Sequence, residues 1–129
     1  MRASAIAALV LLAGCTGGVT IAHEPFADIP VPRGWTSYST ESAIIKSPKA
    51  TAAKLIYFTE TNVDPALEEA RRLLVQAGWK ETKSERFVNA EKFPGVWAEF
   101  SKGEDVCRVT AIEGAYATHV DYAVARVNP

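Results

Sequence analysis

Residues 64–78 carry the clearest helical pattern in the chain, and this pattern limits what the rest can form. Asp64 is a good N-cap, Pro65 suits the first helical position, and Gly78 is placed to end the helix. Between them apolar side chains recur at helical spacing, at Ala66, Leu67, Ala70, Leu73, Leu74 and Ala77. A helix with one apolar stripe must bury that stripe against another layer of structure.

The segments on either side of this helix are rich in strand-forming residues and are separated by turn signals. Strands are expected at 43–45, 52–60, 80–89, 96–101, 106–112 and 118–127, and segment 80–89 is the most weakly patterned of them. The sequence therefore predicts an α+β fold with the order β-β-α-β-β-β, which counts five of these six segments. One amphipathic helix packs on an antiparallel sheet of five or six strands, after a signal peptide and a flexible tether.

The first fourteen residues have the composition of an export signal. Met1 and Arg2 form a short basic region, and an apolar stretch that ends in small residues follows. The stretch is shorter than the roughly 20 residues that a transmembrane helix needs to cross about 30 Å of hydrocarbon. We therefore expect a signal peptide over residues 1–14.

The signal ends in Leu12-Ala13-Gly14-Cys15, which resembles the bacterial lipobox. The resemblance implies cleavage between Gly14 and Cys15, a diacylglyceryl group on the Cys15 sulfur, and a further acyl chain such as palmitate on the freed amino group. Two or three acyl chains hold a protein firmly on a membrane. In the lipoproteins that this signal resembles, an Asp directly after the lipid-bearing cysteine favours retention at the inner membrane. Thr16 occupies that position here, so the resemblance favours the periplasmic side of the outer membrane.

The mature chain is expected to begin with a tether over residues 15–27 and to continue as a single domain over 28–129. Pro30 and Pro32 lie within the segment Asp-Ile-Pro-Val-Pro-Arg-Gly-Trp and favour an extended backbone there. The formal net charge is −1 and no block of like charges exceeds two residues, so nothing in the composition indicates a nucleic-acid partner.

The sequence contains no recognisable catalytic motif. His119 and Asp121 would share one face of the last strand, where they could form an acid–base or metal-binding pair. Metal sites usually collect three or four ligands at characteristic spacings, and no such spacing is present. We therefore expect no enzyme activity, no cofactor and no metal, and we keep His119 and Asp121 as the centre of an alternative.

Aromatic residues and the second cysteine give the remaining expectations. Exposed tryptophan often marks a binding surface, and Trp97 and Trp35 are the candidates. Trp79 directly follows the helix end and is expected in the core. Cys107 alternates with Val109 along one strand and is expected to be buried there.

The lipobox, the tether, the Asp-Ile-Pro-Val-Pro opening and the lone helix that ends in Ala-Gly-Trp together resemble small lipoproteins of bacteria with a similar opening segment. A fainter similarity is to the helix-on-sheet lipoprotein subunits of the outer-membrane β-barrel assembly machine, which often repeat the domain. The resemblance implies a membrane-anchored, non-catalytic binding or assembly module of the cell envelope, with an envelope protein as its partner. The alternative is a small envelope enzyme or metal-binding protein centred on His119 and Asp121.

Overall fold

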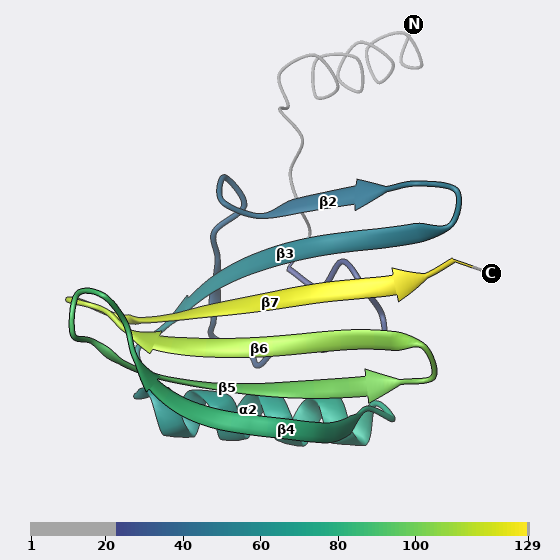
Figure 1. Cartoon of the computed structure of the whole chain (residues 1–129). Helices are drawn as coiled ribbons and strands as arrows, with labels where there is room; N and C mark the ends of the chain where they lie inside the picture. Colours follow the sequence, from purple (N-terminus) through teal and green to yellow (C-terminus); the bar gives the residue numbers. More distant parts are fainter. Residues whose placement is uncertain (1–22, 129) are drawn as a thin grey trace, which may run out of the picture.

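The computed structural model describes residues 23–128, which form one helix and a seven-stranded sheet (Figure 1). Three strands come first: β1 (Thr36–Ser37), β2 (Ala43–Lys46) and β3 (Ala50–Thr59). Helix α2 (Val63–Gln76) follows them. The chain ends with β4 (Lys80–Val88), β5 (Pro94–Lys102), β6 (Asp105–Glu113) and β7 (Thr118–Val127).

The predicted α+β class, with one helix packed on an antiparallel sheet, is confirmed. The order is β-β-β-α-β-β-β-β rather than β-β-α-β-β-β, and the sheet has seven strands rather than five or six. Strand β1 escapes prediction because its two residues are too few to make a pattern. Strand β4 is an edge strand whose side chains are mostly exposed, which explains why the alternation in 80–89 is weak.

The strands lie in the order β1-β3-β7-β6-β5-β4, and β2 pairs with β3 beside β1. Every pairing is antiparallel. The longest pairing joins β3 to β7, from Ala50 opposite Val127 to Thr59 opposite Thr118. Strands from the two ends of the domain therefore lie side by side in the middle of the sheet (Figure 1).

Helix α2 begins slightly earlier than the sequence suggests. Its N-cap is Asn62, so the expectation of an Asp64 cap is wrong; Asp64 lies in the first turn and accepts a 2.7 Å hydrogen bond from Arg86 of β4. The other end follows the prediction. Gly78 adopts a φ of 97°, its N–H donates to Val75, and the N–H of Trp79 donates to Leu74 at 3.0 Å. This is the hydrogen-bond pattern of a Schellman cap, which requires the left-handed residue.

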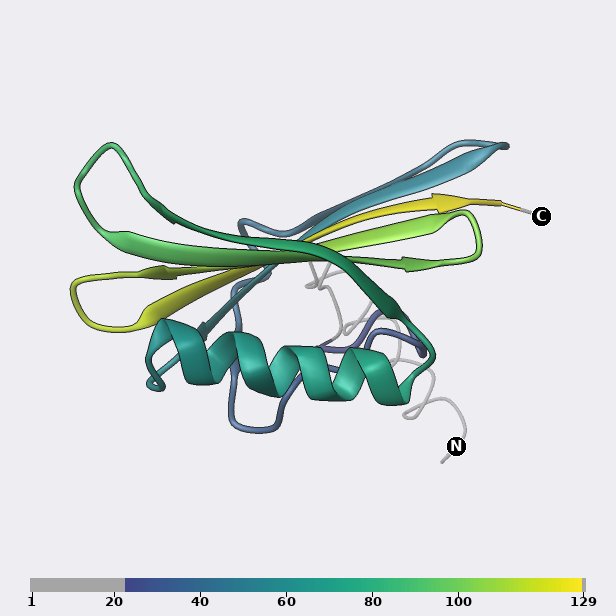
Figure 2. The same cartoon turned by 60° about the horizontal axis from the view of Figure 1, so that its bottom comes forward.

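The molecule has two layers. Helix α2 and the segment 23–35 lie on the same side of the sheet, as Figure 2 shows. The core is formed between these layers, where Leu74 and Trp79 pack with Phe100, Cys107 and other residues that are at most 8% exposed. Within residues 23–128, no helix lies on the opposite side of the sheet, where the β4–β5 loop rises at one end (Figure 2).

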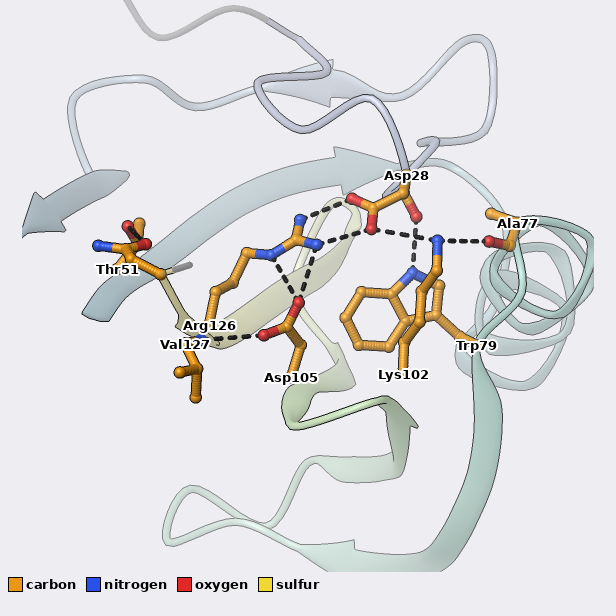
Figure 3. A network of polar contacts seen from close by, with 9 residues as sticks. Asp28, Thr51, Ala77, Trp79, Lys102, Asp105, Arg126 and Val127 are labelled. Carbon is orange, nitrogen blue, oxygen red and sulfur yellow. Dashed lines mark hydrogen bonds and ion pairs between the residues drawn. The ribbon is translucent and has the colours of Figure 1, made fainter. Parts of the chain in front are cut away.

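Asp28 fixes the N-terminal segment to the sheet through a network of polar contacts (Figure 3). Its carboxylate receives two hydrogen bonds from the Arg126 guanidinium, at 2.6 and 2.7 Å. Lys102 approaches the same carboxylate at 3.3 Å and also donates to the carbonyl of Ala77 at the helix end. The Trp79 indole N–H donates to the Asp28 carbonyl at 2.6 Å. One residue thus joins β7, the end of β5 and the C-terminal end of α2.

The last residues of the expected tether also contact the domain. The Tyr57 hydroxyl donates to the carbonyl of His23 at 2.5 Å, and the N–H of Val31 donates to the Glu24 carboxylate at 3.2 Å. Phe26 packs against the core, and the Arg126 guanidinium lies 5.5 Å from its ring centroid. Within the described residues, contacts with the domain therefore reach back to residue 23.

The expected cleavage site at Gly14 and Cys15 lies outside the described residues. Within residues 23–128, no helix has the length and apolar character required to cross a lipid bilayer.

Candidate binding surface

The side of the sheet opposite α2 is the candidate surface, and we call it the open face. In β6 and β7 the buried side chains of Cys107, Val109, Val120 and Tyr122 alternate with the side chains that point to the open face. The strand register places the open-face residues in rows across the sheet. The residues used below are Lys54, Ile56, Phe58, Trp97, Glu99, Arg108, Ile112, His119 and Asp121.

Trp97 lies on the open face and is half-buried. The guanidinium carbon of Arg108 is 4.0 Å from the ring centroid, and the Lys83 ammonium is 5.7 Å from it. Arg108 also donates to the Glu99 carboxylate at 3.1 Å. The indole is therefore held between charged side chains of the neighbouring strands, in the geometry of a cation–π contact.

A second group of rings lies near the other end of the open face. Phe58 of β3 is directly opposite His119 of β7 in the register, and their rings stack with centroids 5.3 Å apart and planes at 27°. The Tyr38 ring also lies next to Phe58, and the centroids of these two rings are 5.3 Å apart. With Ile112, these rings line a surface depression of about 450 Å³, which we call the aromatic hollow.

Asp121 lies beside the hollow, two residues after His119 on the same strand face. Its Oδ2 atom is 3.5 Å from the Lys54 ammonium, whereas its Oδ1 atom is buried without a hydrogen-bond partner. Burial raises the pKa of the Asp121 carboxyl, and the charges of Lys54 and His119 oppose this shift. A buried carboxylate oxygen without a donor is rare and indicates a place where a donor could be received.

The structure separates the two tryptophans that the sequence offers as binding residues. Trp97 lies on the open face, but the expectation for Trp35 is wrong, because its side chain is only 5% exposed. The Trp35 ring packs in the core beside Tyr57 and Tyr122, with centroids 6.4 Å from each. Docking of the 23–35 segment carries this ring under the sheet rather than onto the surface.

His119 and Asp121 share a strand face as predicted, but each has its own neighbour, Phe58 for the histidine and Lys54 for the aspartate. Among residues 23–128, no group of three His, Cys, Asp or Glu side chains is placed to hold a metal ion. The pair therefore lacks the further ligands that a metal site would draw from its surroundings.

The prediction that Cys107 is buried is confirmed, since its side chain is 0% exposed. Burial, with the negative charge of Asp28, raises the pKa of the Cys107 thiol to about 12. The thiol is therefore protonated at neutral pH and has no access to the open face. Trp79 is also buried as predicted.

Sequence reasoning overlooks Phe58, Tyr38 and Arg108, which contact the aromatic rings of the open face. A signal for Arg108 exists, because it alternates with the buried pair Cys107 and Val109 and must therefore lie on the opposite face. The approach of Phe58 to His119 depends on the pairing of β3 with β7, for which the local pattern gives no register.

Comparisons of this chain with protein-family models, with curated proteins and with solved structures find no match.

Proposed function

We propose that this protein is a lipid-anchored, non-catalytic binding or assembly module of the bacterial envelope, and that the open face is its binding surface. The observation that carries the binding role is the one-sided cover of the sheet. Helix α2 and residues 23–35 cover one face (Figure 2). The other face holds Trp97 and the aromatic hollow.

Half-buried aromatic rings on an uncovered sheet are suited to recognition. Tryptophan, tyrosine and arginine are enriched among the residues that dominate the affinity of protein interfaces. The open face carries all three, at Trp97, Tyr38 and Arg108. Trp97, Phe58 and His119 lie on strands rather than on loops, so little side-chain freedom of these rings would be lost on binding.

The membrane anchor rests on the lipobox residues Leu12 to Cys15. Eight peptide units separate Cys15 from His23, which contacts the domain through Tyr57, and they span at most about 28 Å when fully extended. A lipid on Cys15 would therefore hold the domain close to the membrane surface. Thr16 favours the periplasmic side of the outer membrane, and an envelope protein is the expected partner.

The alternative function, an enzyme or metal-binding protein centred on His119 and Asp121, has one observation in its favour. The Oδ1 atom of Asp121 is buried and has no hydrogen-bond partner. The same observation suits a binding surface, and the stacking of His119 on Phe58 fills one side of the histidine ring. We therefore favour the binding role.

The experiment is cross-linking in native membranes followed by mass spectrometry, with wild type, Cys15→Ser and Arg108→Ala. The control is Arg86→Ala, because Arg86 is also an exposed arginine in an ion pair, but on the helix side of the sheet. We expect an acylated Cys15 peptide and an envelope protein cross-linked to wild type and to Arg86→Ala. Both Cys15→Ser and Arg108→Ala should lose this partner.

An unmodified Cys15 would contradict the anchor. A partner retained equally by Arg108→Ala and Arg86→Ala would place binding away from the open face. If no partner is captured and Zn²⁺ shifts the NMR signals of His119, the metal-binding alternative becomes the better description.

A further inference from the structure

The aromatic hollow has one carboxylate without a counterion. Glu41 lines it and forms no ion pair within residues 23–128. Glu113 also lines it, but Glu113 alternates with Ile112 and lies opposite Thr118, so its side chain points to the α2 side of the sheet. Lys54 also lines the hollow, but its ammonium is paired with Asp121 at 3.5 Å. The charge that remains without a counterion therefore favours a cationic occupant.

The rings of the hollow favour the same kind of occupant. Tyr38 and Phe58 lie with centroids 5.3 Å apart, and Tyr38 is 42% exposed. The negative face of an aromatic ring attracts a cation placed over it. A guanidinium is planar, so it can stack on a ring and donate paired hydrogen bonds to a carboxylate at the same time, which an ammonium does less well.

Asp121 adds a hydrogen-bond acceptor at the edge of this site. The neighbouring residue His119 and the residue opposite Asp121 in the register, Ile56, both line the hollow. The Oδ1 atom of Asp121 is buried without a donor, while Lys54 contacts the other oxygen. A donor that entered from the hollow would supply the missing hydrogen bond.

The open face already holds one guanidinium in such an environment. Arg108 lies 4.0 Å from the Trp97 ring centroid and donates to Glu99 at 3.1 Å. Ring and carboxylate are thus supplied by one strand and the arginine by the next. The aromatic hollow offers rings and carboxylates without the arginine.

We propose that the aromatic hollow binds an arginine side chain of the partner protein. This inference rests on the proposed binding role of the open face and adds the chemistry that the partner must present. The arginine would stack on Tyr38 or Phe58 and pair with Glu41.

The test is an NMR titration of the full ¹⁵N-labelled chain in detergent micelles with N-acetyl-arginine amide. The matched control ligand is N-acetyl-citrulline amide, which has nearly the same shape but no charge. We expect arginine to shift the backbone signals of Ile112, Gly114 and His119 in a saturable way. Citrulline should bind at least several times more weakly.

Variants then assign the contacts. Glu41→Gln and Phe58→Leu should each weaken arginine binding by about two- to fivefold, the range expected for a solvent-exposed ion pair or cation–π contact. Lys54→Met should strengthen binding, because it removes the competing cation from Asp121. Glu104→Gln, in the β5–β6 turn away from the hollow, should leave the affinity unchanged.

Equal binding of arginine and citrulline, or no effect of both Glu41→Gln and Lys54→Met, would overturn the inference. A normal far-UV circular dichroism spectrum of each variant shows that a loss of binding is not a loss of folding. If arginine fails to bind but the cross-linked partner still depends on Arg108, the proposed function stands and only the arginine site is wrong. If Cys15 is unmodified, the anchor fails while arginine binding can still hold.

Discussion

Removing the charge of Asp28 should destabilise the domain by an amount that depends on pH. The hydrogen bonds from Arg126, which outweigh the opposing effect of burial, together with Lys102, lower the pKa of the Asp28 carboxyl from 3.8 to about 2. One pKa unit corresponds to about 1.4 kcal/mol, so the shift sets an upper limit of about 2.5 kcal/mol. The side chain is 24% exposed, and solvent screening reduces the expected value to about 1–2 kcal/mol for Asp28→Asn at pH 7.

The sign of the pH dependence follows from the direction of the shift. Because the pKa of Asp28 is lower in the folded state, its stabilising effect is full above the unfolded value of 3.8 and is lost as the pH falls toward about 2. About half of it should remain at pH 3. The free energies of unfolding of wild type and Asp28→Asn should therefore converge as the solution becomes acidic.

The assay is urea unfolding followed by circular dichroism at pH 7, 5, 4 and 3. Asp64→Asn is the control, because Asp64 also pairs with an arginine but both side chains are more than half exposed. The control should change stability by no more than about 0.5 kcal/mol. The reasoning is refuted if Asp28→Asn costs no more than Asp64→Asn, or if its cost is the same at pH 7 and pH 3.

Three further predictions concern the core and the helix end. Trp35→Ala should lower the free energy of unfolding by about 3–5 kcal/mol, and Trp97→Ala by only about 1 kcal/mol, because Trp35 is buried and Trp97 is half-buried. Urea unfolding measures both values, and similar values would contradict the placement of the two side chains. Gly78→Ala should lower the free energy of unfolding by about 1 kcal/mol, because Gly78 has a φ of 97° and alanine is unfavourable in this left-handed conformation. Thermal or urea unfolding measures the change. Cys107 should not react with iodoacetamide at pH 8 in the folded protein, because its thiol is buried with a pKa of about 12. It should react once urea unfolds the chain. Rapid labelling of Cys107 in the folded protein would show that the thiol is accessible.

The helix and the long strands can be predicted because their signals are local. The apolar stripe of α2 and the left-handed position of Gly78 are both visible in the sequence, and both appear in the structure. Strand β6 alternates between buried and accessible residues, so the burial of Cys107 can also be read locally. The N-cap differs by two residues because Asn62 and Asp64 are both good capping residues.

The candidate surface depends on long-range pairing, which the sequence does not specify. Phe58 meets His119 only through the register of β3 with β7. Trp35 lies in a segment without strand alternation, so its side cannot be assigned from a pattern. Its burial follows from the docking of residues 23–35, in which the contacts of Asp28 with Arg126 and Trp79 take part.

The network around Asp28 also determines how a mechanical load on the N-terminus would spread through the domain. Its contacts reach Arg126 in β7, Lys102 at the end of β5 and, through Arg126, Asp105 at the start of β6 (Figure 3). Lys102 in turn holds the carbonyl of Ala77 at the end of α2. Tension that arrives through the N-terminal segment is therefore divided among three adjacent strands and the helix, instead of peeling one strand from the edge of the sheet.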